Sequence, residues 1–404
     1  MMRANKVLST ILFLSPFVFS FAFAMDIYIP AIPAMKEVLQ TSQENIQLTL
    51  SLFMFMTGLG QLVMGPITDQ YGRRSLALLS VALFIVGSGL CALSNSIQLL
   101  IIARMIQAFG GCGMLVVAFA TVRDQFSGNE AAKVYSFLNC GIGLSPLFAP
   151  IIGSYLFDWF NWQAGFVFLT IMASLIFLLA FFRMTETLPA ENRVKLSTNV
   201  FLRYWQVLKN RTFITYTSCA TAGLITFFVF FSSSPYIVIN LLDVPVKYFG
   251  YYFFTVGATF FIGSLICGKV ANKVGPFKVV VVGTLLLLIA GLTMLVWYLV
   301  SGISVAQYIL PCMLAGIGGS FMMGAGAGGA MEPFGKAAGL AAAMVGCIEF
   351  LCAAIFGTII MHWPVTSTIP LSITMTTSSL LVLLLMVSYH FSERPSESLK
   401  LDVA

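Results

Sequence analysis

Twelve stretches of about 20 apolar residues follow one another along this chain of 404 residues. A stretch of that length crosses the hydrocarbon core of a bilayer as an α-helix, which satisfies its own backbone hydrogen bonds there. Only the polar, basic segment 184–211 connects two stretches by more than about fifteen residues, so we expect no soluble catalytic domain. The predicted spans cover residues 8–34, 46–67, 75–94, 97–122, 132–156, 163–183, 212–236, 248–268, 277–299, 304–329, 337–361 and 367–390.

The composition excludes a soluble protein. Charged residues make up 9% of the chain and hydrophobic residues 59%, whereas a soluble domain carries about 25% charged residues. The eight cysteines fall inside apolar stretches without disulfide or zinc spacing, and two histidines are too few for a histidine-based metal centre. We therefore expect no metal site.

The first apolar stretch has a second interpretation. Arg3 and Lys6 precede it, and residues 22–24 resemble the cleavage site of a signal peptide. The stretch runs from residue 7 to residue 34, however, which is long enough to cross the membrane with some tilt. This length favours an uncleaved first span.

The basic residues are divided unequally between the two sides of the membrane. If the spans alternate in direction, one side holds eighteen Lys and Arg and the other holds only Lys36 and Lys247, while Arg104 lies inside a span. The positive-inside rule places the richer side, with both termini, in the cytoplasm. The net charge of +6 therefore reflects membrane orientation, and we expect no nucleic-acid partner.

A short internal repeat divides the chain into halves. Two glycines and an Asp or Asn recur after span two and after span eight at an offset of 203 residues. Such parallel repeats are typical of one large transporter architecture. We predict an all-α integral membrane protein with twelve transmembrane helices in two pseudo-symmetric six-helix bundles. Its predicted parts are the first bundle 1–183, a cytoplasmic linker 184–211, the second bundle 212–390 and a cytoplasmic tail 391–404.

The loop after span two is the most informative short segment. A tight turn there favours Gly72, which can take a positive φ, and the side chain of Asp69 can accept charge-assisted bonds from a neighbouring arginine or lie at a helix N-terminus. The alternative is a solvated turn that only carries a topology signal.

The loop resembles the signature of the major facilitator superfamily, G-x-x-x-D-x-x-G-R-[RK], and the chain is similar to its Bcr/CflA group of drug:proton antiporters. The narrower resemblance rests on Asp26-Ile-Tyr28-Ile-Pro30, on Arg104-x-x-Gln107-x-x-Gly110, on Arg123-Asp124 and on Met331-Glu332-Pro333-Phe334. It implies the major facilitator fold and a conformational loop made of Gly65, Asp69, Gly72, Arg73, Arg74, Arg123 and Asp124.

Span five only partly matches the antiporter pattern G-P-x-x-G-G of this superfamily. It keeps Pro150 and Gly153, with Gly141 and Pro146 upstream, but Ala149 and Ser154 replace two glycines. The residues that remain predict a bent, closely packed helix. An ordinary packing helix is an equal alternative.

Three ionisable residues lie well inside spans, where each costs about 2.5–3.5 kcal/mol if it has no partner. Asp26 and Arg104 lie at similar depths in the first half, so a salt bridge is geometrically feasible, and the resemblance implies the same pairing. Glu349 has no basic residue at its depth, and a protonatable carboxyl there suits proton coupling. A neutral, hydrogen-bonded Glu in a polar pocket is the alternative. Asp26, Arg104 and Glu349 are therefore the candidate proton-coupling residues.

Aromatic and Met side chains suit loosely defined hydrophobic ligands, although most of those in a membrane protein face lipid. The candidate residues of a substrate cavity are Tyr28, Phe53, Met56, Gln107, Tyr135, Phe228, Phe231 and Tyr236.

The leading hypothesis is proton-coupled export of small amphiphilic compounds or drugs across a bacterial inner membrane by alternating access. We expect no cofactor, the proton gradient as energy source, and a monomer whose partners are protons, lipid and a small-molecule substrate. One alternative is a carrier dedicated to one metabolite, such as a siderophore, peptide or amino acid, in either direction. Another is a membrane receptor or assembly factor that transports nothing. An enzyme is disfavoured, because no nucleophile motif is present and the glycine-rich run 316–329 lacks the ending of a phosphate loop.

Overall fold

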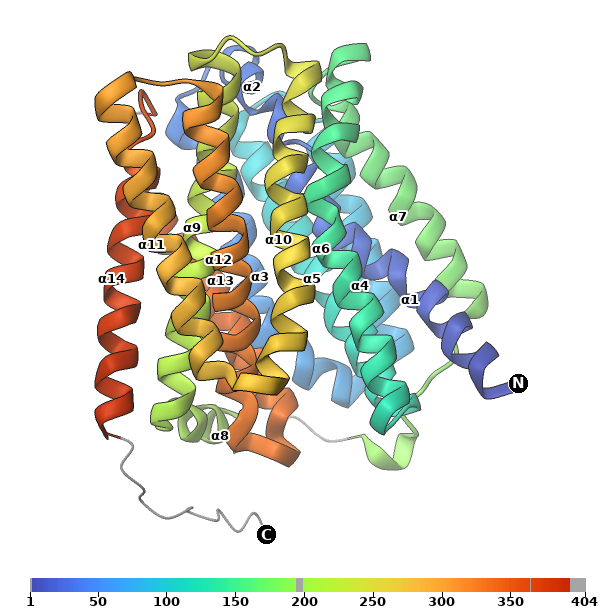
Figure 1. Ribbon diagram of the computed structural model, residues 1–404. Helices are drawn as coiled ribbons and strands as arrows, with labels where there is room; N and C mark the ends of the chain where they lie inside the picture. Colours follow the sequence, from blue (N-terminus) through green and yellow to red (C-terminus); the bar gives the residue numbers. More distant parts are fainter. Residues whose placement is uncertain (1, 194–198, 364, 393–404) are drawn as a thin grey trace.

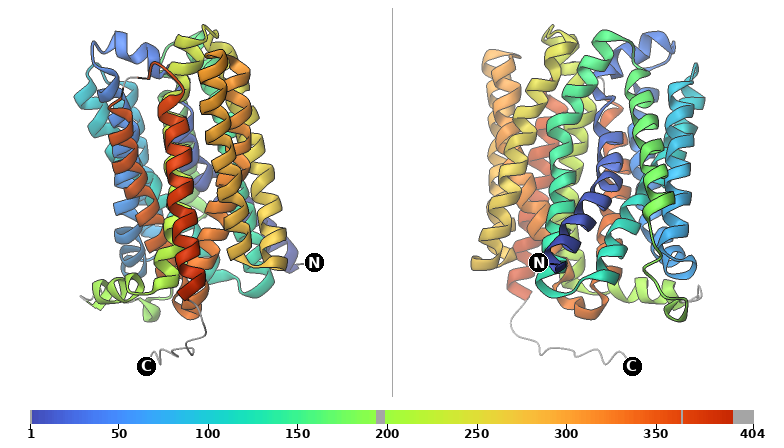
Figure 2. Two further views of the ribbon diagram at one scale, coloured as in Figure 1. Left: turned by 60° about the vertical axis from the view of Figure 1, so that its left-hand side comes forward. Right: turned by 90° about the vertical axis from the view of Figure 1, so that its right-hand side faces the viewer.

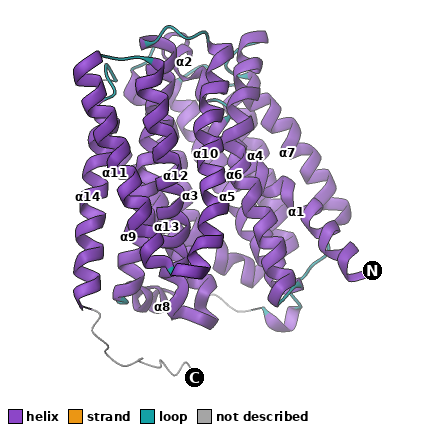
Figure 3. Ribbon diagram, in the orientation of Figure 1, coloured by secondary structure: helices purple, strands orange, loops and turns teal. Residues whose placement is uncertain are grey.

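The computed structural model describes residues 2–193, 199–363 and 365–392, and these residues form helices and loops without a strand (Figure 3). Twelve of the described helical segments are long and apolar enough to cross a membrane, which confirms the predicted fold class. The tail 391–404 falls almost wholly outside the described residues. The helices are α1 Met2–Asp26, α2 Ile32–Val38, α3 Gln43–Tyr71, α4 Arg73–Ala92, α5 Ile97–Gln125, α6 Gly128–Trp159, α7 Ala164–Arg183, α8 Asn199–Leu208, α9 Arg211–Pro235, α10 Val246–Val274, α11 Pro276–Ser301, α12 Val305–Met331, α13 Ala338–Met361 and α14 Ile369–Ser392.

The first span is not one continuous helix. Helix α1 ends at Asp26, a 3₁₀ turn follows over Ile29–Ala31, and α2 begins at Ile32. Pro30 and Pro33 explain the break, because a proline lacks the N–H that an ongoing helix needs and its ring clashes with the preceding turn. As a result, the last carbonyl groups of α1 lie inside the protein rather than at its surface.

The spans stand side by side as a bundle, with α7 and α1 toward one side and α11 and α14 toward the other (Figure 1). The start of α1 and the end of α14 lie at the same end of this bundle, which we call the terminal end. The first-half helices α3 and α6 pack against the second-half helices α13 and α10, respectively. These two pairs form most of the contact between the halves.

The internal repeat extends to the conformation of the two equivalent turns. Gly72, between α3 and α4, has φ 92° and ψ 163°, and Gly275, between α10 and α11, has φ 84° and ψ 157°. Only a residue without Cβ adopts such angles at no steric cost. The positive φ predicted for Gly72 is therefore confirmed.

The repeat extends further to the packing of neighbouring spans. A Cβ added to Gly110 of α5 would lie 2.5 Å from the Phe84 nitrogen and 2.7 Å from the Ser80 oxygen of α4. A Cβ added to Gly318 of α12 would lie 2.6 Å from the Gly283 oxygen and 2.9 Å from the Leu287 nitrogen of α11. Ser80 and Phe84 of α4 correspond to Gly283 and Leu287 of α11 at an offset of 203 residues, and Gly110 corresponds to Gly318 at an offset of 208 residues. The second offset is larger because α11 is longer than α4. The two halves thus use the same backbone contact.

Candidate functional site

The guanidinium of Arg104, on α5, is fully buried in the first half. Its Nη1 donates to the Ala24 carbonyl at 2.8 Å and to Oε1 of Gln107 at 2.5 Å. Ala24 lies in the last turn of α1, whose carbonyls lose their helical partners at the proline break and carry the negative end of the helix dipole. Arg104 is therefore held by a helix C-terminus.

Aromatic rings surround the rest of this guanidinium. Its carbon lies 4.2 Å from the ring centre of Phe53, 4.5 Å from that of Tyr28 and 5.9 Å from that of Phe166. Among the described residues, Nε and Nη2 of Arg104 have no hydrogen-bond partner. Cation–π attraction, worth about 2 kcal/mol when the cation is desolvated, replaces the bonds that water would make. This cage was not predicted from the sequence.

Asp26, the last residue of α1, is also buried, but it bonds elsewhere. Its Oδ2 accepts a hydrogen bond of 2.6 Å from the Ser145 hydroxyl on α6. No ion pair between Asp26 and Arg104 is present in the described part of the chain. The salt bridge that the sequence made feasible is therefore absent from this structure, and the two side chains are held by separate partners.

The loop between α3 and α4 brings the Arg73 guanidinium to the carboxylate of Asp69. Arg73 is buried and binds Asp69 Oδ1 through Nη1 at 2.7 Å, and Asp124 through Nε at 2.7 Å and Nη2 at 3.2 Å. Arg123 donates to the same Asp69 oxygen at 3.3 Å. The predicted bond between Asp69 and a neighbouring arginine is confirmed. Gly65 has nothing within 4 Å of an added Cβ, so close packing does not explain it.

A residue outside the predicted set completes this network. Glu186, which follows α7, accepts from the backbone N–H of Arg73 at 2.8 Å and from that of Arg74 at 3.3 Å. These two residues open α4, so Glu186 lies at the helix N-terminus where a carboxylate is favoured, and Asp69 does not. Arg74, which is partly exposed, donates to the Phe181 carbonyl at 3.0 Å. A charged residue after span six is the only sequence signal that pointed to Glu186.

Helix α6 carries its glycines and prolines on two contacting faces. An added Cβ at Gly153 would overlap the Ile27 carbonyl, and one at Gly141 would touch the Phe19 ring at 3.5 Å. These two glycines let the α1 chain approach.

The prolines of α6 lie on the face toward the second half. The Pro150 oxygen lies 2.9 Å from an added Cβ at Gly250 of α10, and the Pro146 oxygen lies 3.2 Å from one at Gly257. The four antiporter-like residues of α6 thus occupy contact faces. A role in antiport stays a prediction.

Glu349 lies in the middle of α13 and is half-buried. It makes no hydrogen bond or ion pair with any described residue. The neighbouring Phe350 ring touches Phe21 of α1 at 6.3 Å between centres, so Phe350 faces the first half. Consecutive helix residues point about 100° apart, and Glu349 therefore points away from that contact.

The remaining cavity candidates make separate contacts, and their role in a substrate cavity stays a prediction. Gln107 bonds Arg104 and donates to Ser88 at 2.8 Å, while Tyr135 donates to the Phe119 carbonyl at 3.2 Å. Phe228 packs against Gly357, and the Phe231 ring makes edge or tilted contacts with Phe227, Phe230 and Phe253. Met56 is half-buried, and the buried Tyr236 hydroxyl has no described partner.

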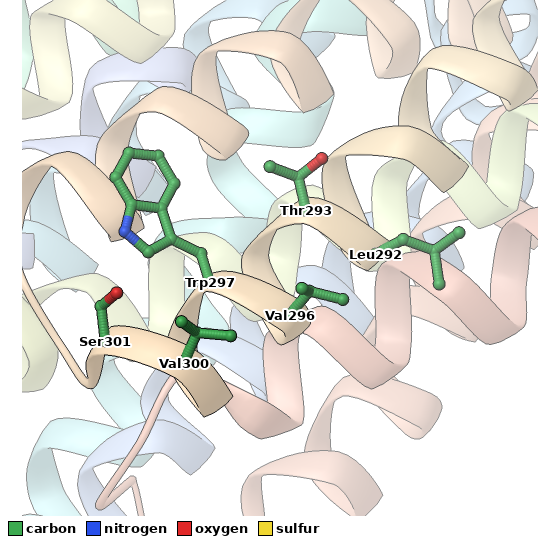
Figure 4. Close-up of a pocket in the computed structure, with 6 residues that line it drawn as sticks. All are labelled: Leu292, Thr293, Val296, Trp297, Val300 and Ser301. Atoms are coloured by element: carbon green, nitrogen blue, oxygen red, sulfur yellow. The ribbon is translucent and has the colours of Figure 1, made fainter.

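An open hollow of about 490 Å³ lies elsewhere, along one outward face of α11 (Figure 4). Leu292, Val296 and Val300, which line it, are 44%, 58% and 79% exposed, so this face is a lipid-facing surface. None of the predicted cavity residues lines it.

Comparisons with known proteins agree with the fold and with the resemblance. The family model of the Major Facilitator Superfamily matches residues 12–357. The chain is 33% identical over 372 residues to the chloramphenicol resistance protein of Pseudomonas aeruginosa, covering 88% of this chain and 86% of that protein. It is 30% identical over 369 residues to multidrug resistance protein D of Escherichia coli, covering 89% and 90%.

One similar solved structure is that of the xylose transporter XylE from E. coli in a partially occluded inward open conformation. The TM-score is 0.75 at 12% sequence identity, and the match covers 98% of this chain and 100% of that one. This likeness supports the fold. The chain therefore belongs to the major facilitator superfamily and is a membrane transporter, not an enzyme.

Proposed function

We propose that this protein is a proton-coupled antiporter that exports small amphiphilic compounds, drugs among them, across the bacterial inner membrane by alternating access. The support is a family match across most of the chain and relatives that are named for resistance to chloramphenicol and to several drugs. These names favour export of foreign compounds over a carrier for a single metabolite.

The contact between Asp26 and Ser145 is the observation that best supports proton coupling. Asp26 is buried and has only the hydroxyl of α6 as its hydrogen-bond partner in the described chain. The residue after Ser145 is Pro146, which packs against Gly257 of the other half. A change in protonation of Asp26 would therefore act one residue away from the surface on which the halves meet. A proton that enters the cell supplies about 2.3 kcal/mol per 100 mV, which is enough to drive a substrate uphill.

Alternating access requires that the contact between the halves opens at either end in turn. At the end opposite to the termini, the hydroxyl groups of Tyr155 on α6 and Tyr251 on α10 lie 2.6 Å apart. At the terminal end, which we propose to be cytoplasmic, an added Cβ at Gly339 of α13 would lie 3.2 Å from Arg123 Nη1. We propose that the Arg73 network holds the first half rigid while these contacts exchange, in a monomer.

Transport in everted membrane vesicles tests the proposal. With chloramphenicol and a panel of unrelated cationic dyes as probes, the parent protein should accumulate substrate when a pH gradient is imposed. Asp26→Asn should abolish this accumulation but keep exchange of substrate for substrate, because exchange needs no net proton transfer. Glu349→Gln, at the second candidate carboxyl, shows whether that residue is also needed.

Proton-driven accumulation by Asp26→Asn would show that Asp26 is not the coupling residue. A parent protein that moves one metabolite and none of the panel would instead favour a dedicated carrier. Absence of any flux in liposomes made from purified protein would argue against a transporter of either kind.

A further inference from the structure

The linker between the halves contains a helix, α8, that lies across the terminal end of the bundle rather than along it (Figures 1 and 2). The Tyr204 hydroxyl donates to the Leu62 carbonyl of α3 at 3.2 Å, and the side chains of Tyr204 and Val207 are 8% and 3% exposed. The same helix contacts α13 of the second half. One face of α8 therefore fixes it to the bundle beside both halves.

The opposite face of α8 carries large apolar side chains without a protein partner. Leu202 is 61% exposed and Trp205 is 58% exposed, one turn apart on the helix. Arg203 and Lys209 are exposed beside them, and Lys209 Nζ lies 5.9 Å from the Trp205 ring centre. Trp with neighbouring basic residues is the composition of helices that lie in the boundary between headgroups and acyl chains.

The linker segment around α8 carries only positive charges. Residues 193–211 contain five Lys and Arg and no Asp or Glu, and one of the five, Lys195, lies outside the described residues. Arg193 pairs with Glu186 at 3.6 Å, whereas neither Arg203 nor Lys209 pairs with an acidic side chain in the described chain. An anionic surface attracts each such cation about fivefold more strongly than a neutral surface does.

We propose that α8 is an interfacial anchor that binds anionic phospholipids, with Arg203 and Lys209 at the headgroup phosphates and Trp205 and Leu202 in the acyl boundary. The binding is independent of the substrate and of proton coupling. Because α8 contacts both α3 and α13, lipids bound to it would lie next to the contact between the halves that must open during transport. A bilayer is the favoured occupant over a soluble acidic protein, because α8 lies across the end of a bundle of membrane spans (Figure 2) and carries exposed apolar side chains beside its cations.

Quenching of Trp205 fluorescence by brominated lipids tests the anchor. The full-length protein is reconstituted in phosphatidylcholine vesicles that contain either brominated phosphatidylglycerol or the same amount of brominated phosphatidylcholine. The difference between the parent and Trp205→Phe isolates Trp205 from the other four tryptophans. We expect stronger quenching of Trp205 by brominated phosphatidylglycerol than by brominated phosphatidylcholine.

A matched pair of variants separates a site from a general charge effect. Arg203→Gln/Lys209→Gln removes the two cations of α8 and should abolish the preference for phosphatidylglycerol. Lys269→Gln/Lys273→Gln removes two exposed cations of α10 at the same end and should keep it. Retained thermal unfolding temperature in both variants checks that each one folds.

Three outcomes would overturn the anchor. Trp205 that neither lipid quenches would lie in water or against a soluble partner. Equal quenching by both lipids would mean interfacial insertion without headgroup recognition. Equal loss of the preference in both double variants would reduce the effect to net surface charge.

Discussion

The separation of Asp26 from Arg104 makes a quantitative prediction about their energetic coupling. Asp26 binds the Ser145 hydroxyl at 2.6 Å, and Arg104 binds the Ala24 carbonyl at 2.8 Å, so the two residues share no hydrogen-bond partner. The perturbation is a double-mutant cycle of Asp26→Asn and Arg104→Gln. Such a cycle isolates the interaction between two side chains from the cost of each substitution alone.

The coupling energy expected from this cycle differs by several kcal/mol between a buried ion pair and the separate contacts seen in the structure. If the residues formed a buried ion pair, removing one would leave an unpaired charge, at a cost of about 3–5 kcal/mol, and most of that cost would appear as coupling. In the observed arrangement, Asn can still accept from Ser145, so Asp26→Asn should cost less than about 1 kcal/mol. Arg104→Gln should cost about 3 kcal/mol, because it loses a charge-assisted bond and the aromatic contacts. We expect a coupling below about 1 kcal/mol.

Reversible unfolding in mixed micelles of a mild detergent and dodecyl sulfate supplies the free energies. A control cycle of Gln107→Leu and Ser88→Ala crosses a direct hydrogen bond of 2.8 Å and should give a coupling of about 1 kcal/mol. A coupling between Asp26 and Arg104 above about 2 kcal/mol would contradict the structure and restore the ion pair.

Three further substitutions test other contacts. Glu186→Gln should speed amide hydrogen exchange in the first turn of α4 about tenfold, from the loss of about 1.5 kcal/mol of cap and dipole stabilisation, whereas Glu191→Gln in the same linker should not. Gly110→Val should destabilise the protein by at least about 2 kcal/mol through overlap with α4, and Gly328→Val, with open space around it, by less than about 0.5 kcal/mol in the same unfolding assay. Tyr251→Phe should raise the rate of amide hydrogen exchange in the last turns of α6, because the hydrogen bond to Tyr155 is lost. An unchanged rate there would show that this bond does not hold the two helix ends together.

The spans could be predicted from the sequence because their signal is local. A helix that crosses a bilayer needs a fixed length of apolar residues, and each of the twelve predicted ranges overlaps a helix of the structure. The ends were less predictable. For example, α3 runs from Gln43 to Tyr71 beyond the predicted 46–67, because Ser42 caps the helix outside the apolar stretch by accepting from the Asn45 N–H.

The sequence could predict how deep each site residue lies in the membrane, but not toward which neighbouring helix its side chain points. The sequence placed Asp26 and Arg104 at similar depths, yet the side to which each points depends on how the helices are rotated against their neighbours. That rotation follows from packing, such as the approach of Ile27 to Gly153. Glu186 was missed for a related reason, since its bond to Arg73 joins residues 113 positions apart.

The two halves repeat their backbone contacts but not their buried charged residues, so they can have different roles in transport. The position of Arg104 in the first half corresponds, at the offset of 208 set by Gly110 and Gly318, to Cys312 in the second. Cys312 is buried and uncharged, so the fixed intramembrane cation has no counterpart there. Equivalent backbone contacts allow each half to move as a rigid body, while the aromatic cage and Asp26 lie in the first half only. A change in protonation of Asp26 would therefore act on the packing of the first half, while the equivalent backbone contacts of the second half stay as they are.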